Sequence, residues 1–111
     1  MRLEDLGEPM QITFRRRSAK LTAEAREAID KVVDLLNRHP KVRVEVRVWT
    51  DGKGKLTKHQ ALSASRAFAI VQALIARGIE AKRVRAAGQG KAKQDGARVI
   101  LHRLANVQIL E

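Results

Sequence analysis

The chain has 111 residues, which suits one domain and is too short for two domains with separate cores. Hydrophobic residues make up 44%, but the aromatic ones are only two Phe and one Trp, so aliphatic side chains must fill the core. Cysteine is absent, which excludes disulfides, zinc–thiolate sites and cysteine nucleophiles. The formal net charge of +11 favours polyanionic partners, although scattered charges are also typical of a solvated basic surface.

Targeting signals are not apparent in the sequence. No apolar run approaches the ~20 residues that span a bilayer. The residues after Met1 lack the apolar centre of a signal peptide. If the protein is exported, we expect its targeting segment and any membrane contact to lie outside this sequence. Residues 1–9 are interpreted as a polar lead-in, and residues 10–111 as the domain.

The first part of the domain predicts a strand and a helix. Met10–Phe14 alternates apolar with polar residues, which is typical of a short strand with one buried face. Thr22 is a good helix N-cap, and Pro40 should end the helix near His39 because proline disfavours helical geometry in the residue before it. One face of this helix is apolar and is formed by Ala25, Ile29, Val32, Val33 and Leu36.

The clearest pattern in the chain lies at Lys41–Trp49, where valine occupies every second position. A period of two with β-branched residues predicts a strand with one face against the core. Thr50–Gly54 should form a loop, in which the glycines allow unusual backbone angles.

A second helix should begin at Thr57–Gln60, which matches a capping box, and end at Gly78. We expect its buried face to consist of Leu62, Ala69, Ile70, Ala73 and Leu74, widened by Phe68, Val71 and Ile75.

The last part of the chain is less regular. Arg83–Gly88 predicts a third strand with Gly88–Gly90 as its exit, and 91–96 a loop. In the tail, residues 97–111, the alternation at Val99 and Leu101 and at Val107 and Ile109 allows one or two strands, or a short helix first.

This order predicts an α+β fold of βαβαβ(β) type, a two-layer sandwich with both helices on one face of a mixed sheet.

The residues offer little for catalysis. His39, His59 and His102 lie far apart in the sequence and lack metal-ligand spacing. Gly52-Lys-Gly-Lys has neither the length nor the ending of a phosphate-binding P-loop. No nucleic-acid motif or aromatic stacking platform accompanies the basic residues. We therefore expect no enzymatic activity, no cofactor, no metal and no specific nucleic-acid ligand.

Asp51 and Arg66 form the candidate binding pair. Asp51 follows the best strand and Arg66 lies early in the next helix, a junction where ligands commonly bind. Together they suit a zwitterion, because Asp51 can accept an ammonium and Arg66 can bind a carboxylate with two hydrogen bonds. Spacing alone favours a simpler interpretation, an exposed ion pair between the two that ties the loop to the helix.

A family resemblance favours the ligand-binding interpretation of this pair over the simple ion pair. Val44-Glu-Val-Arg-Val-Trp-Thr50-Asp51-Gly-Lys-Gly54 and Leu62-Ser63-Ala-Ser-Arg66-Ala67 resemble the signature of OmpA-like domains. Phe14 and Leu21 are similar to the family's opening strand and helix start, Gly78-Ile79 to its helix exit, and Gly88-Gln-Gly90 to its Gly-x-Gly turn. The similarity extends from about Ile12 to Gly90 with nearly uninterrupted spacing.

The resemblance implies non-catalytic binding of peptidoglycan, in which an aspartate and an arginine clasp the diaminopimelate of the stem peptide. It implies that the protein anchors a Gram-negative envelope component to the cell wall from the periplasm. The residues that carry this role over, or line the same pocket by position, are Thr50, Asp51, His59, Leu62, Ser63 and Arg66.

The sequence also departs from the family pattern. His59 stands where the family usually has asparagine, and the closing Asn-Arg-Arg run is missing. Aligning the tail on Val107 puts Ala105 and Asn106 at the arginine positions, whereas aligning it on Val99 keeps Arg98. Whether Arg98 or Arg103 lies near the site stays open.

The alternatives are an OmpA-like fold, natural or engineered, that binds protein instead of wall, and a basic domain that binds nucleic acid or anionic lipid. Dimerisation is also open.

Overall fold

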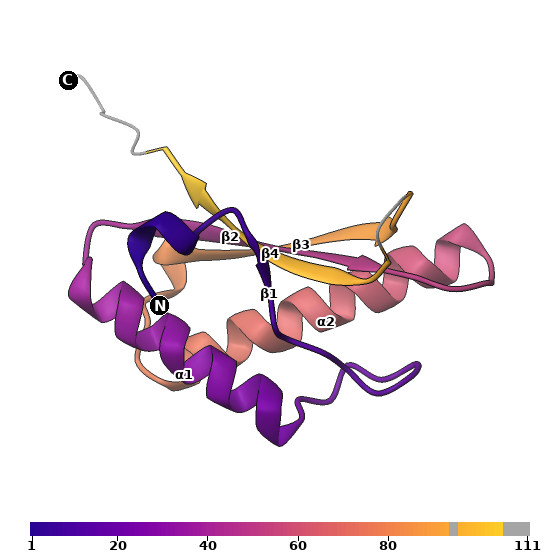
Figure 1. Cartoon of the computed structure of the whole chain (residues 1–111), viewed down its shortest axis with the longest axis horizontal. Coiled ribbons are helices and arrows are strands. Elements are labelled where there is room, and N and C mark those ends of the chain that lie inside the picture. Colours follow the sequence, from indigo (N-terminus) through magenta and orange to yellow (C-terminus); the bar gives the residue numbers. More distant parts are fainter. Residues whose placement is uncertain (94–95, 106–111) are drawn as a thin grey trace.

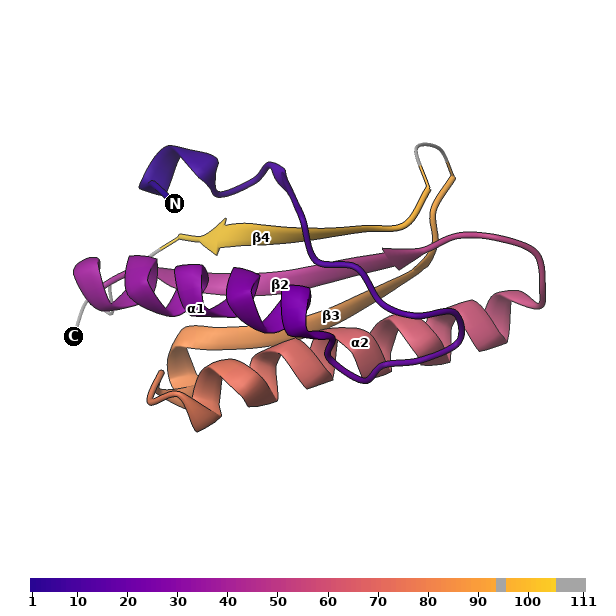
Figure 2. The ribbon, with the colours of Figure 1, turned by 60° about the horizontal axis from the view of Figure 1, so that its bottom comes forward.

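Four strands form one mixed sheet, and two helices cover one of its faces (Figures 1 and 2). The computed structural model describes residues 1–93 and 96–105. Its elements are η1 (Leu3–Asp5), β1 (Pro9–Met10), α1 (Ala23–Arg38), β2 (Arg43–Thr50), α2 (Leu56–Ala76), η2 (Ala81–Arg83), β3 (Val84–Lys91) and β4 (Arg98–Leu104). The strand order is β1-β4-β2-β3, with β2 and β3 parallel and the other pairs antiparallel. The predicted α+β sandwich is confirmed.

Strand β2 is the centre of the core. Val44, Val46 and Val48 are at most 1% exposed and face the helices, as their alternation predicts. The helices and β4 meet them with side chains that are almost fully buried: Ile29, Val32 and Leu36 from α1, Ile70 and Leu74 from α2, and Val99 and Leu101 from β4. Neither helix of the described residues has the length and apolarity to cross a membrane.

Helix α1 begins and ends where the sequence predicts. The Thr22 hydroxyl accepts a hydrogen bond from the Ala25 amide at 3.1 Å, and His39 is the C-cap residue. The cap satisfies one amide that the helix leaves without a partner.

Helix α2 differs from the prediction in its start and in its buried face. It begins at Leu56 after Lys55, which makes no side-chain cap, so the predicted capping box at Thr57–Gln60 is wrong. Phe68 is 58% exposed, although we expected it on the buried face. The reason is that polar Ser63 and Arg66 are buried instead, and this rotates the helix away from the face that hydrophobicity alone predicts.

The strand bounds also differ. Only Pro9–Met10 pairs with β4, because the chain then leaves the sheet edge, so the predicted strand Met10–Phe14 is mostly loop. Strand β3 does not exit at Gly88–Gly90 but continues to Lys91, pairing with β2 past a bulge. In the tail, the strand at Val99 and Leu101 is confirmed, whereas Val107 and Ile109 lie outside the described residues. The domain bounds at 10–111 stay a prediction.

The sheet face away from the helices carries charged residues. Glu45 is 9% exposed and accepts hydrogen bonds from Arg47 at 2.7 Å and from Arg85 at 2.6 Å. The hydrogen bond from Arg47 is the main reason that the pKa of Glu45 lies below its ordinary value, although burial acts in the opposite direction.

Helix α2 approaches β3 so closely that Gly88 leaves no room for a side chain. A Cβ at Gly88 would lie 2.3 Å from the Ala64 backbone nitrogen. Two hydrogen bonds hold the same contact. The side-chain amide of Gln60 donates to the Gly88 carbonyl at 2.9 Å, and the backbone amide of Gly90 donates to the Ser63 hydroxyl at 2.9 Å. This contact fixes the first turns of α2 against the ends of the parallel strands.

We predict that Gly88→Ala lowers the free energy of unfolding by about 2–3 kcal/mol, because the methyl group must push the helix from the sheet. Urea unfolding measures this change. Gly78→Ala is the matched control: Gly78 has φ +97° but open space around its Cβ, so only backbone strain is added, at about 1 kcal/mol. A Gly88→Ala variant as stable as Gly78→Ala would contradict the close contact.

Candidate functional site

A cleft of about 1030 Å³ opens at the end of the sheet where β2 ends and β4 begins. Its walls come from five places: the loop before α1, the end of β2, the loop after β2, the first turns of α2, and the start of β4. The lining residues are Ile12, Thr13, Phe14, Arg16, Arg17, Val48, Trp49, Asp51, Gly52, Lys53, Gly54, Lys58, His59, Leu62, Arg66, Ala97, Arg98 and Val99.

The structure brings the predicted pair into this one cleft. Asp51 is exposed in the loop after β2, and Arg66 reaches the cleft from α2 with only 7% of its surface exposed. In the described part of the chain, neither Asp51 nor Arg66 takes part in an ion pair within 4.0 Å. The simple ion pair that spacing favours is therefore not formed, and both charges face the cleft.

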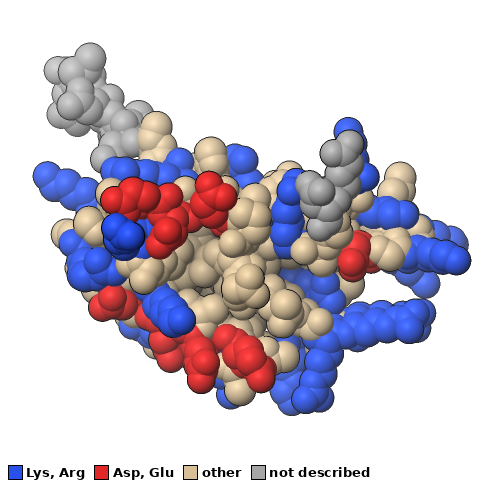
Figure 3. Space-filling view, in the orientation of Figure 1, with Lys and Arg blue, Asp and Glu red and all other residues tan. Residues whose placement is uncertain are grey.

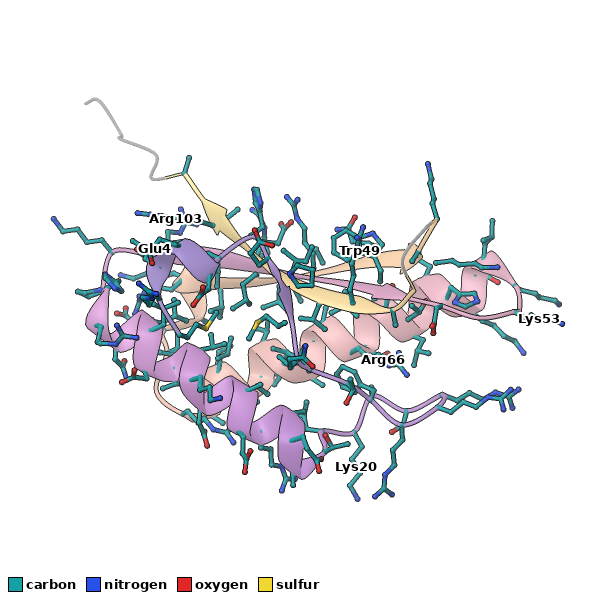
Figure 4. All side chains as sticks on the ribbon, in the orientation of Figure 1. Glu4, Lys20, Trp49, Lys53, Arg66 and Arg103 are labelled. Carbon is teal, nitrogen blue, oxygen red and sulfur yellow. The ribbon has the colours of Figure 1, made fainter. Side chains whose placement is uncertain are left out.

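Arg66 is held by the loop before α1 (Figure 4). Its Nε donates to the Ser18 carbonyl at 2.8 Å, its Nη2 donates to the Arg15 carbonyl at 3.2 Å, and its guanidinium lies over the Phe14 ring at 4.9 Å. Burial lowers the pKa of Arg66 from its ordinary value, while the charge of Asp51 raises it. Because a guanidinium has five N–H groups, these two hydrogen bonds leave most of its donors for a ligand.

Thr50 and His59 form a buried link behind Asp51. The Thr50 hydroxyl donates to His59 Nδ1 at 2.7 Å and lies 3.3 Å from the Gly90 carbonyl. His59 Nε2 lies 3.2 Å from the Lys53 carbonyl, which can only accept, so we assign the proton to Nε2. The imidazole thus joins both ends of the loop that presents Asp51.

The other predicted site residues lie at different depths. Leu62 lines the cleft and is half-buried. Ser63 is fully buried, donates to the Gln60 carbonyl at 3.0 Å and does not line the cleft. Thr50, at 1% exposure, also lies behind the lining. Direct ligand contact by Thr50 or Ser63 stays a prediction.

Trp49 and Arg98 also line the cleft, and they answer the open question of which arginine of the tail lies near the site. They are cross-strand partners in β2 and β4, and the Arg98 guanidinium lies 4.7 Å from the Trp49 ring centre. Arg98 lines the cleft, whereas Arg103 lies near the other end of β4 beside Leu3 and Pro40. The register of β4 therefore puts Arg98 at the site, as the alignment on Val99 requires.

The cleft is strongly basic. Among the described lining residues, Asp51 is the sole acidic one, and it faces six basic ones: Arg16, Arg17, Lys53, Lys58, Arg66 and Arg98. In Figure 3, Lys and Arg gather at the end of the molecule where the loops before α1 and after β2 project. Such a site suits a ligand with one cationic group and more than one anionic group.

Within residues 1–93 and 96–105, no cluster of three or more His, Asp or Glu side chains could hold a metal ion.

Comparisons with known proteins agree with this architecture. A sequence model of the OmpA family matches residues 13–98. The probable lipoprotein YiaD of Escherichia coli (strain K12) is 34% identical over 87 residues, covering 78% of this chain and 40% of that protein. The chain thus spans less than half the length of this curated relative.

Two solved structures share the fold. The C-terminal domain of Helicobacter pylori MotB has a TM-score of 0.76 at 19% identity, over 89% of this chain and 85% of that one. The peptidoglycan-associated lipoprotein from Burkholderia pseudomallei has a TM-score of 0.71 at 20% identity, over 82% of this chain and 88% of that one. Since the family match covers most of the chain, including the strand, loop and helix that form the cleft, the chain belongs to the OmpA family.

Proposed function

We propose that the chain binds peptidoglycan without catalysis, by clasping the diaminopimelate of the stem peptide, and anchors an envelope protein to the cell wall in the periplasm. One observation carries this proposal: Asp51 and Arg66 face the same cleft with opposite charges and no ion pair between them. Diaminopimelate ends in a carbon that bears both an ammonium and a carboxylate, so it complements that pair. A relative named peptidoglycan-associated lipoprotein has the same fold, which supports the choice of polymer.

In the proposed complex, Asp51 accepts the ammonium and Arg66 donates to the carboxylate through the N–H groups that the loop leaves free. Leu62 and Trp49 provide apolar surface beside them. Thr50 and Ser63, behind the cleft, and His59, in its lining, hold the loop and α2 in place.

We predict that Asp51 and Arg66 bind two different groups of the ligand. Asp51→Asn should weaken binding of a diaminopimelate stem peptide about tenfold or more, because the ammonium loses its charged acceptor. Arg66→Lys should weaken it similarly, since lysine cannot replace a planar donor pair. Isothermal titration calorimetry measures both, with Arg38→Gln, whose charge lies on α1 away from the cleft, as control.

A stem peptide with lysine in place of diaminopimelate sharpens this test, because lysine keeps the ammonium and lacks the distal carboxylate. Asp51→Asn should weaken binding of both peptides, whereas Arg66→Lys should weaken binding of the diaminopimelate peptide more than that of the lysine peptide. Equal loss of both peptides in Arg66→Lys would contradict the assigned role of Arg66. No binding of either peptide to the unmodified chain at millimolar concentration would end the proposal.

We also predict that His59 positions Asp51. His59→Ala should speed hydrogen exchange of the amides at 51–54 and weaken stem-peptide binding, because the loop loses its link to α2. Thr50→Val should act through the same link, so the double variant should lose less stability than the sum of the single ones. Ser65→Ala, at an exposed position of α2 that does not line the cleft, controls for changes in the helix itself. Additive losses in stability would show that Thr50 and His59 act independently.

A further inference from the structure

The segment Arg15–Ser18 is a strained turn that Arg66 holds over the cleft. The Ser18 amide donates to the Arg15 carbonyl at 3.1 Å and closes the turn. Arg17 has φ +59° and is the only described residue other than glycine with a positive φ. The left-handed conformation is unfavourable for a residue with a Cβ, and glycine would adopt it freely.

Arg66 is what holds this turn. It donates to the carbonyls of Arg15 and Ser18, the first and last residues of the turn, while its guanidinium covers the Phe14 ring just before it. The side chain proposed to bind the ligand carboxylate therefore also determines where the turn lies. Any ligand on Arg66 lies next to the turn, because one guanidinium contacts both.

The turn presents two cations to the cleft. All three arginines of the turn are exposed, and Arg16 and Arg17 line the cleft whereas Arg15 does not. Neither Arg16 nor Arg17 forms an ion pair with an acidic side chain among residues 1–93 and 96–105. A backbone strained at Arg17, a residue that lines the cleft, points to a role for that residue in the site.

We propose that the Arg15–Ser18 turn is a second anion-binding element, which makes this chain prefer stem peptides whose carboxylates are free over stem peptides in which they are amidated. The inference rests on the proposed function and deepens it. With Arg66 on the diaminopimelate carboxylate, Arg16 and Arg17 receive a further carboxylate of the same peptide, that of the D-glutamate. Guanidinium groups suit carboxylates because they can donate two parallel hydrogen bonds.

The test compares two peptides that differ in one group: N-acetylated L-Ala–γ-D-Glu–diaminopimelate–D-Ala with a free D-glutamate α-carboxylate, and the same peptide with that carboxylate as an amide. Both keep the diaminopimelate. Calorimetry on the full chain should show about fivefold tighter binding of the free peptide. In Arg16→Gln/Arg17→Gln the preference should fall to about one, while binding of the amidated peptide changes little.

Three single variants separate the effect of charge from that of the backbone. Arg15→Gln removes the same charge from the same turn but away from the cleft, so it should keep the preference. Arg17→Gly relieves the strained φ and removes the side chain, so its thermal midpoint should be no lower than that of the unmodified chain while the preference drops. Arg17→Lys keeps charge without the planar donor pair and should retain part of the preference.

The outcomes distinguish the two levels of the proposal. Equal affinity for both peptides, with binding still lost in Asp51→Asn, would overturn the role of the turn and leave the clasp intact. A preference lost equally in Arg15→Gln would assign it to the overall positive field, and this also overturns the proposal. Binding of neither peptide, with tight binding of phosphatidylglycerol vesicles through Arg16 and Arg17, would make the turn a membrane contact and overturn both.

Discussion

The buried guanidinium of Arg66 is the constraint around which the site is organised. A charge that is only 7% exposed needs hydrogen-bond acceptors, because an uncompensated buried charge is strongly destabilising. Backbone carbonyls of the loop before α1 meet this need, and they come from a segment that has left the sheet edge. The short β1, the exposed Phe68 on α2 and the strained φ of Arg17 are all consistent with this one requirement.

A second constraint is the close approach of α2 to β3 at Gly88. It puts the first turns of the helix beside the ends of the two parallel strands, where the loop after β2 leaves the sheet. His59 can then bridge Thr50 and Lys53 from that helix. Asp51 is thus presented by a loop that is tied to α2 at both ends, while Arg66 lies two helical turns further along the same helix. The geometry of the pair depends on the rigid contact of helix and sheet.

The basic residues are scattered along the sequence, and only the folded chain brings many of them together at one site. On the sheet face away from the helices, Glu45 forms ion pairs with both Arg47 and Arg85. Basic side chains from the loop before α1, the loop after β2 and the start of β4 instead converge on one cleft. A site with a single carboxylate among several cations differs from a simple clasp for a zwitterion, because it attracts ligands with additional negative charge.

The sequence by itself determined the helices, the central strand and the family. The valine alternation in β2 and the Thr22 cap are local signals with local causes, and the motif around Asp51 and Arg66 identified the cleft. Tertiary structure decided the rest. The rotation of α2 depends on burying Ser63 and Arg66, which hydrophobic patterning does not anticipate. The choice of Arg98 over Arg103 depends on the register between β4 and β2, a long-range pairing that no short stretch of sequence specifies. That Arg15–Ser18 belongs to the site follows only from hydrogen bonds to a residue 48 positions away from Ser18.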